Sequence, residues 1–197
     1  MATRRFAVAR DALQGAARRR QHALGLFRRA AANDPPIDRV IADGLEIAAH
    51  SLQSGALYAL RADLDSPFEV RADCLWPAST ALSRVLRGAP EALGAHCQRV
   101  GLPVVVEDLP RFPAFADDPL LRDSGIRGLV VAPVRAQAGP GGVVLVGCIH
   151  RRLYGPEEAE FVQGVADVIA SALYRRDWRD SAQGTVRVGS ARRMTPG

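Results

Sequence analysis

The chain has 197 residues, 48% of them hydrophobic and 24% charged. This length allows one well-buried core with flanking segments, and the composition is that of a globular protein and excludes a disordered chain. All 26 basic residues are arginine, and the formal net charge is +5. Residues 1–32 hold eight Arg and one Asp, residues 174–197 hold six Arg and two Asp, and the middle holds 12 Arg and 18 acids. The ends are therefore basic and the middle is acidic.

These basic ends have three interpretations. The absence of lysine beside abundant Ala, Arg, Gly and Pro is typical of a GC-rich genome, which accounts for much of the arginine without a functional role. The alternatives are contact with an acidic partner and binding of nucleic acid. Nucleic-acid recognition needs groove-reading or stacking side chains among the basic residues, and no such pattern is visible in this sequence. We therefore do not expect a nucleic-acid partner.

The cysteines and the hydropathy bear on the cellular compartment. Cys74, Cys97 and Cys148 are odd in number and form no C-x-x-C pair, so neither a disulfide framework nor a zinc site is predicted. A reducing cytoplasm fits this pattern. No apolar run reaches the roughly 20 residues that cross a bilayer, so no membrane partner is expected. The Arg-rich start lacks a secretory h-region and resembles an organellar transit peptide in composition alone.

The N-terminal part of the chain predicts two helices. Residues 3–32 contain no proline and are rich in Ala, Arg, Leu and Gln, which favours a long exposed helix. The sequence Asn33-Asp34-Pro35-Pro36 ends that helix and supplies an Asn or Asp N-cap, with prolines in the first turn of the next one. Apolar residues recur at helical spacing over 37–52 and predict a face that packs on a core.

The remainder predicts strands, short helices and a closing helix. Strands at 56–61 and 68–75 form a hairpin, and two short lid helices follow at 79–87 and 90–100. A strand at 104–106 leads into a proline-punctuated loop at 109–123, and strands at 125–134 and 142–150 form a second hairpin. A last helix begins at Pro156, with carboxylates in its first turn. Residues from Gly184 onward have no periodicity and are expected to be disordered.

Several stretches resemble the GAF family of sensory domains. Residues 101–109, GLPVVVEDL, are similar to the family's G-x-P-h-x-h-x-D segment, and FADDPL at 115–120 is similar to the phenylalanine-containing loop that follows it. Residues 125–134, GIRGLVVAPV, are similar to G-I-R-S-h-h-h-x-P-h, except that Gly128 replaces the usual serine. The resemblance continues through GVVLVG at 142–147 and the closing helix, and it covers residues 36–176.

The resemblance implies an α+β fold, with a central antiparallel sheet of about five to six strands, lid helices, and flanking N- and C-terminal helices. It also implies a ligand pocket between one sheet face and the lid, and a homodimer formed through the terminal helices. The expected domains are a basic N-terminal helix at 1–35, a GAF-like sensory domain at 36–176, and a helix end with a disordered basic tail at 177–197. Fold membership does not fix the ligand, so the cofactor stays unknown.

The ligand classes of the family were compared with the residues present. Bilin sensors carry a Cys-His pair, whereas His96 and Cys97 stand in the reverse order and lack that subfamily's surroundings. Haem needs a neutral imidazole in an apolar cavity; of His22, His50, His96 and His150, the last two are the candidate axial ligands, beside their interpretation as ordinary half-buried histidines. The cyclic-nucleotide signature N-K-x-F-D-E requires a lysine, which this chain lacks.

One enzyme of the superfamily, the free methionine sulfoxide reductase, also has three cysteines. The loop after Val106, where that enzyme carries a cysteine, holds Phe112, Phe115 and Asp117 instead. No H-E-x-x-H motif or paired-carboxylate site is present, and the histidines are scattered along the chain. We therefore expect no catalytic site.

The expected pocket is a generic one. Alternation over residues 128–134 puts Leu129, Val131 and Pro133 on one face, which we expect to face the lid because the glycine and alanine of the other face suit close packing against a helix. Arg127 has two interpretations, an anchor for an anionic ligand and a salt-bridge partner of Asp108 or Asp123. The predicted ligand-binding residues are Trp76, His96, Cys97, Phe115, Arg127, Val131 and Cys148, with Leu86 also in the pocket wall.

The leading functional hypothesis is a small-molecule-sensing module. A ligand binds the pocket, shifts the lid and changes the relative orientation of the dimer helices. A separate signalling partner protein then responds to this change. The alternatives are a structural dimerisation module with a filled pocket and a thiol redox enzyme of the free methionine sulfoxide reductase type.

Overall fold

The structure, a computed structural model, describes residues 2–61, 65–75, 89–112, 125–135 and 141–191. Its elements, in chain order, are α1 (Ala2–Ala32), α2 (Ile37–Leu52), β1 (Gly55–Leu60), β2 (Glu69–Cys74), α3 (Ala89–Val100), β3 (Val104–Val106), the 3-10 helix η1 (Leu109–Arg111), β4 (Gly128–Val134), β5 (Gly142–Cys148) and α5 (Pro156–Ala191). The predicted order of helices and strands is confirmed across these residues.

The strands form one antiparallel sheet in the order β2-β1-β5-β4-β3. The two predicted hairpins are present, because β1 pairs with β2 and β4 pairs with β5. The strand β1 also pairs with β5, with Leu57 opposite Leu145, which joins the two hairpins at the centre of the sheet. The short strand β3 pairs with β4 and forms one edge. The predicted α+β class is therefore correct.

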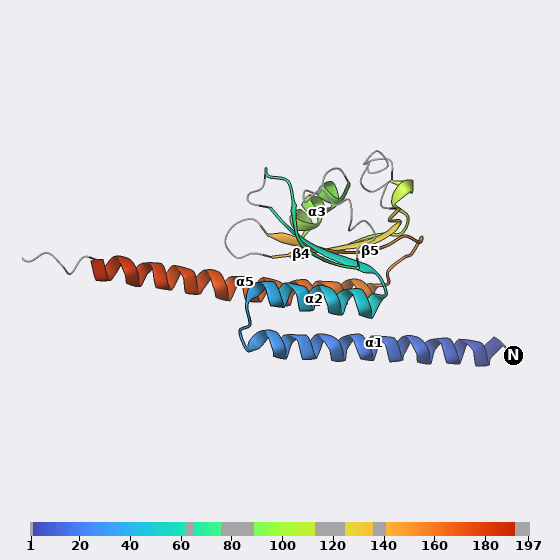
Figure 1. The fold of residues 1–197 in the computed structure, drawn as a ribbon. Coiled ribbons are helices and arrows are strands. Elements are labelled where there is room, and N and C mark those ends of the chain that lie inside the picture. The colour runs from blue at the N-terminus through green and yellow to red at the C-terminus, as the bar shows by residue number, and fades with distance from the viewer. Residues whose placement is uncertain (1, 62–64, 76–88, 113–124, 136–140, 192–197) are drawn as a thin grey trace, which may run out of the picture.

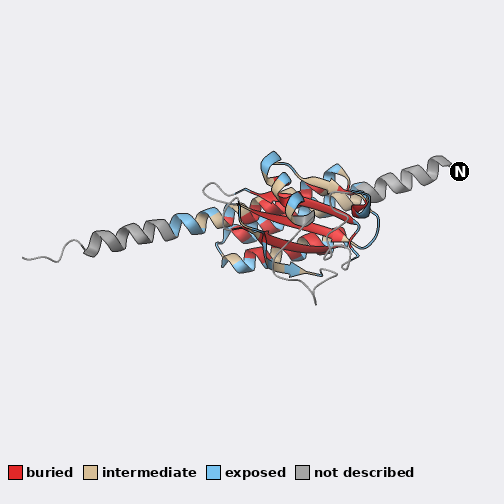
Figure 2. Ribbon diagram, turned by 90° about the horizontal axis from the view of Figure 1, so that it is seen from above, coloured by how far each residue is buried: buried red, intermediate tan, exposed pale blue. Residues whose placement is uncertain are grey.

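The elements stack in layers (Figure 1). The helix α3 covers one face of the sheet, α2 and α5 cover the other, and α1 lies beneath α2 and α5. Residues alternate between these faces, so that Leu129 and Val131 pack with α3 whereas Val130 and Ala132 pack with the helices below. The predicted orientation of this strand is confirmed. Buried residues concentrate in the sheet and in the helices against it (Figure 2).

The end of α1 packs against the domain instead of standing in solvent. Leu24, Phe27 and Ala31 are buried with α2 and α5 in the larger core cluster. Two helix glycines make room for them: a Cβ at Gly44 of α2 would lie 3.0 Å from the ring of Phe27, and one at Gly164 of α5 would lie 2.5 Å from Leu24. The described part of the chain contains no helix long and apolar enough to cross a membrane.

Two local predictions were wrong. The helix α5 continues past Gly184 to Ala191, whereas this segment was expected to be disordered; it contains no proline, so nothing in its sequence forbids helical backbone. At the start of α2, Pro36 occupies the N-cap and no side chain caps the helix. Asp34 instead forms an ion pair with Arg179 of α5. The Asp34 carboxylate therefore pairs with a side chain far away in the sequence instead of capping α2.

Candidate functional site

The candidate site is the sheet face under α3, where the family resemblance places a ligand pocket. Apolar side chains from β1, β4, β5 and α3 form a buried cluster on this face, joined by residues at the start of the β3–β4 connection and just before β4. Its members are Leu57, Ala59, Phe68, Leu93, Cys97, Val106, Leu109, Ile126, Leu129, Val131, Val143 and Leu145.

Cys97 ties α3 to the sheet. Its thiol is fully buried and donates to the backbone oxygens of Leu102 at 3.1 Å and Val131 at 3.3 Å. Burial raises the pKa of Cys97 to about 12, because the thiolate would lose its hydration. The predicted site residues Cys97 and Val131 therefore come together, and burial disfavours the thiolate form of Cys97 that a nucleophile needs.

Arg61 provides a polar group at the edge of the same face, where it covers the ring of Phe68. Phe68 is fully buried beneath α3, and a Cβ at Gly94 of that helix would lie 2.9 Å from its ring. The guanidinium of Arg61 lies over the Phe68 ring, 5.1 Å from its centroid, and the residue is only 8% exposed. Alternation from Leu57 and Ala59 puts position 61 on this face, so the periodicity of the sequence was the signal that could have identified Arg61 as a site residue.

Arg127 forms an ion pair beside the cluster. Its Nε and Nη2 each donate to the Asp108 carboxylate at 2.8 Å, and Arg111 approaches the same carboxylate at 3.2 Å. These hydrogen bonds and charges hold the pKa of Asp108 below its ordinary value and raise the pKa of Arg127. Of the two interpretations of Arg127, the salt bridge to Asp108 is the one observed.

Two predicted site residues lie elsewhere. Cys148 packs with the cluster on the opposite face, because β5 alternates and Val144, Val146 and Cys148 all point toward the helices below. His96 is exposed and accepts a hydrogen bond from Arg99 at 3.1 Å. It directly precedes Cys97, about 100° away around the helix, so the two side chains cannot both face the sheet. Trp76, Leu86 and Phe115 lie outside the described residues.

The histidines and cysteines also bear on cofactors. All four histidines are exposed, so neither His96 nor His150 sits in an apolar cavity as a haem ligand would. Within the described ranges, no group of three or more His, Cys, Asp or Glu side chains is arranged to hold a metal ion. The three cysteines are free thiols.

The strand β4 is bound from both of its faces. Cys97 of α3 donates to the oxygen of Val131, and Gln163 of α5 donates through Nε2 to the oxygen of Pro133 at 3.1 Å. Gln163 is itself held by Asp167 at 2.8 Å on the next turn of α5. One short segment of β4 therefore joins the layer above the sheet to the long helix below it.

An antiparallel sheet with a covering helix on one face and long helices on the other is the architecture of small sensory modules. The family model for the GAF domain matches residues 36–173, and the chain belongs to this family. No curated protein sequence matches the chain.

Solved structures similar to this chain share its fold. The GAF domain of a phosphoenolpyruvate-protein phosphotransferase from Coxiella burnetii has a TM-score of 0.69 and 15% identity, covering 84% of this chain and 98% of that one. The free methionine-R-sulfoxide reductase from Neisseria meningitidis has a TM-score of 0.64 and 14% identity, over 82% and 93%. A methyl-accepting chemotaxis protein has a TM-score of 0.59 and 16% identity, over 76% and 95%.

Proposed function

We propose that this chain is a small-molecule-sensing signalling module whose ligand binds on the α3 side of the sheet and whose output passes along α5. The observation that supports this most directly is the double attachment of β4. Cys97 binds the strand from the α3 side and Gln163 binds it from the α5 side, two residues further along. A ligand that moves α3 thereby acts on a strand to which the output helix is also attached.

The layer below the sheet fits this role. The helix α5 packs on β4 and on α1 and α2, and then leaves the domain (Figure 1). Its side chains Tyr174 and Trp178 stand exposed on this departing stretch. We propose that these two side chains become buried between the helices of a homodimer. A partner protein in the cytoplasm then recognises the relative orientation of those helices.

The residues around the site suggest the character of the ligand. Cys97 and Val131 provide an apolar floor, and Arg61 places a buried cation at its edge. Such a combination suits a flat or apolar molecule with one polar or anionic end.

The test is native mass spectrometry with a UV-visible spectrum on protein purified from its own host. Sensing predicts a stoichiometric bound mass that is lost on unfolding, and an absorbing ligand would identify its class. A Gln163→Leu variant should keep this mass but lose any ligand-dependent change in the dimer. Ser171→Ala is the matched control on α5, because the Ser171 hydroxyl donates only within its own helix, to Asp167 at 2.8 Å. Protein without a bound mass, and without affinity in a broad ligand screen, contradicts the proposal.

A second candidate is a structural dimerisation module without a ligand. The close approach of Gly94 to Phe68 and the full burial of Cys97 favour it, because they leave no space between α3 and the sheet at those positions. This candidate predicts the same dimer, but with no bound mass and no response to small molecules. Under either candidate, we propose that the chain has no catalytic activity of its own.

A further inference from the structure

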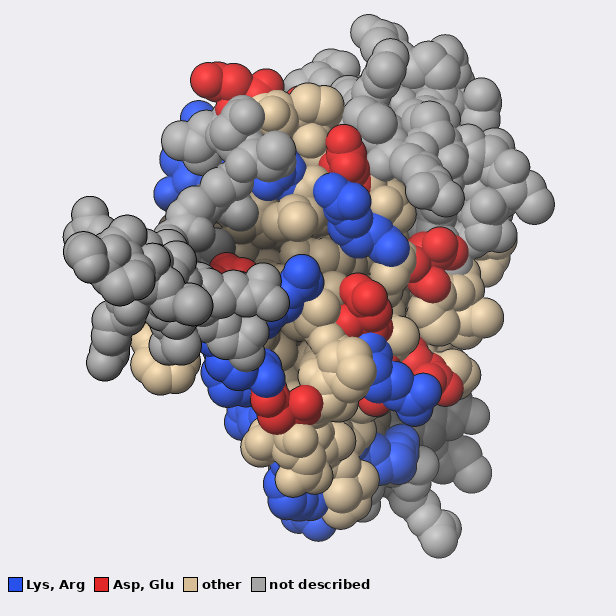
Figure 3. Space-filling model, turned by 60° about the vertical axis from the view of Figure 1, so that its left-hand side comes forward, with Lys and Arg blue, Asp and Glu red and all other residues tan. Residues whose placement is uncertain are grey.

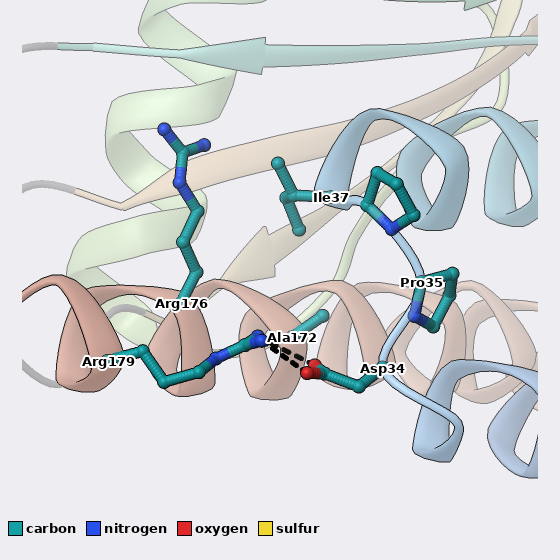
Figure 4. A pocket seen from close by; sticks show the side chains of 7 residues that line it. Asp34, Pro35, Ile37, Ala172, Arg176 and Arg179 are labelled. Atoms are coloured by element: carbon teal, nitrogen blue, oxygen red, sulfur yellow. Dashed lines mark hydrogen bonds and ion pairs between the residues drawn. The ribbon is translucent and has the colours of Figure 1, made fainter.

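A cleft lies on the opposite side of the molecule from α3, where the connection between α1 and α2 passes α5 (Figure 4). Its volume is about 400 Å³, within the range of small-molecule sites. Asp34, Pro35 and Ile37 form one wall, and Ala172, Arg176 and Arg179 form the other. The last three follow one another at helical spacing, so they lie on one face of α5.

Arginines outnumber carboxylates at this cleft. Arg179 donates to both carboxylate oxygens of Asp34, through Nη2 to Oδ1 at 2.6 Å and through Nη1 to Oδ2. Arg175 stands beside the same carboxylate, with Nε 3.9 Å from Oδ1 and Nη2 donating to the oxygen of Ala31 at 2.9 Å. Arg176 adds a third guanidinium to the wall. One carboxylate, that of Asp34, therefore meets the guanidinium groups of both Arg179 and Arg175, and this excess of positive charge favours a further anion at the cleft.

The charge is local. Figure 3 shows arginine and acidic side chains interspersed on the described surface that faces the viewer, without a broad field of either sign. A surface with interspersed charges suits a small anion at the cleft better than a polyanion, which needs an extended basic surface.

The remaining wall is apolar and rigid. Pro35, Ile37 and Ala172 present hydrocarbon, so a bound molecule can place an apolar group against them while its anionic end meets arginine. Figure 4 shows Arg179 directed at Asp34, whereas Arg176 points away from that pair. The backbone of Asp34 has a φ of 60°, in the left-handed region that residues other than glycine seldom adopt.

We propose that this cleft is a second ligand site, independent of the α3 face, for a small organic anion with an apolar body. A carboxylate or a phosphate monoester binds the fork of Arg179 in the place that Asp34 takes in its absence, with Arg176 as a further cation. Asp34 is thus an internal competitor, and binding exchanges the contact between the α1–α2 connection and α5 for contacts to the ligand.

The test uses the full chain with isotope-labelled isoleucine methyl groups, followed by NMR during addition of benzoate, phenyl phosphate or benzamide. Benzoate and phenyl phosphate are the two anion types, and benzamide is the uncharged analogue of benzoate. We expect saturable shifts at the Ile37 methyl with one or both anions and none with benzamide. The stronger anion identifies the acid class. Ile126 lies in the cluster under α3 and reports on that face separately.

Variants separate the competitor from the binding groups. Asp34→Asn should bind the anion about fivefold more tightly, because asparagine tolerates the left-handed backbone while releasing Arg179. Arg179→Gln and Arg176→Gln should each bind about tenfold more weakly. Arg151→Gln is the control: it removes one arginine and one exposed ion pair, to Glu107 at 2.7 Å, on the connection that precedes α5. Its affinity should equal that of the wild type.

Several results overturn the proposal: no shift at Ile37 with either anion, equal shifts with benzamide, or unchanged affinity in Asp34→Asn. The proposal is also overturned if both Arg179→Gln and Arg176→Gln bind the anion with unchanged affinity. Two arginine variants are used so that the test remains possible if one of them does not fold. Chemical-shift changes at the Ile126 methyl without changes at Ile37 contradict anion binding at the cleft and support a ligand on the α3 face. The second site and the proposed sensing function therefore fail separately.

Discussion

Gly164 of α5 and Leu24 of α1 touch so closely that a Cβ at Gly164 would lie 2.5 Å from Cδ2 of Leu24. The contact fixes the end of α1 against the domain, and a side chain at position 164 fits only if the buried Leu24 side chain is displaced. The C-terminal end of the basic helix α1 is therefore packed on the GAF domain.

We expect Gly164→Val to displace this part of α1 and to lower the free energy of unfolding by about 2 kcal/mol, as overpacking of a tight contact does. Trypsin should cleave faster after Arg28 and Arg29, while the rest of the domain stays folded. Gly25→Val is the control, because a Cβ at Gly25 meets no atom within 4 Å. Equal stability and equal cleavage in the two variants would contradict the packing of α1.

Gly128 is the position at which this chain departs from the serine of the family pattern. A Cβ there would lie 2.8 Å from the backbone oxygen of Arg152, which cannot move aside as a flexible side chain can. Gly128→Ser should therefore destabilise the protein by about 2–3 kcal/mol, measured by urea unfolding. At Gly155 a Cβ has its nearest neighbour at 4.0 Å, so Gly155→Ser should have a much smaller effect. A stable Gly128→Ser variant would mean that the Arg152 backbone lies elsewhere.

The buried thiol of Cys97 should be inert. Because its pKa is raised to about 12, almost no thiolate exists at pH 8, and iodoacetamide should leave Cys97 unmodified in the folded protein. The half-buried Cys74 and Cys148 provide the internal comparison, and all three should react once the chain is unfolded in guanidinium. Peptide mass mapping gives the result. Rapid modification of Cys97 would refute the inert thiol, and sulfoxide reductase activity that depends on Cys97 would also refute the absence of catalysis.

The Asp108–Arg127 pair should make stability depend on acid pH. The pKa of Asp108 is lowered from its ordinary value of 3.8 in the folded state. The ionised carboxylate therefore contributes fully to the stability of the fold above pH 3.8, and this contribution is lost as the pH falls through the lower folded pKa. Arg127→Gln should therefore lower Tm at pH 7, and its difference from the wild type should shrink as the pH falls below 3.8 and Asp108 becomes protonated. Arg151→Gln, which breaks the exposed pair to Glu107, should change Tm little. A difference for Arg127→Gln that stays constant down to pH 2 would exclude this linkage.

The exposed aromatic residues of α5 should form the dimer contact. Trp178 is 66% exposed and Tyr174 lies one turn before it, so we expect the full chain to dimerise and Trp178→Ser to weaken the dimer at least tenfold. Leu153→Ser is a matched control, because Leu153 is also 66% exposed but lies before α5 begins. Sedimentation velocity distinguishes the cases. A wild-type monomer at micromolar concentration would exclude the helical dimer.

The sequence predicted the fold well because its signals were periodic. Alternation along β4 correctly placed Leu129 and Val131 under α3, since one buried face of a strand fixes every second residue. The same rule applied to β5 puts Cys148 on the other face, so the prediction that Cys148 lines the pocket was wrong. His96 was misplaced for a similar reason, since only one of two consecutive helical residues can face the sheet.

Long-range polar contacts could not be predicted in the same way. The local sequence around Asp34 indicates an N-cap, and nothing in it reveals that Arg179, 145 residues away, takes its carboxylate. The cleft beside this pair exists only because two distant segments meet. The partner of Arg127 was narrowed to two acids, Asp108 and Asp123, but choosing between them required the fold.

The helix α5 has 36 residues and therefore extends about 54 Å as one continuous rod. Its first half is clamped between the sheet and α1, while its end projects beyond the domain on the side opposite the start of α1 (Figure 1). A rod held at one end acts as a lever, and a tilt of about 5° about the start of the helix displaces the far end by about 5 Å. A rearrangement too small to break the core packing is thus magnified at the end of α5, where the proposed partner would bind, far from either proposed ligand position.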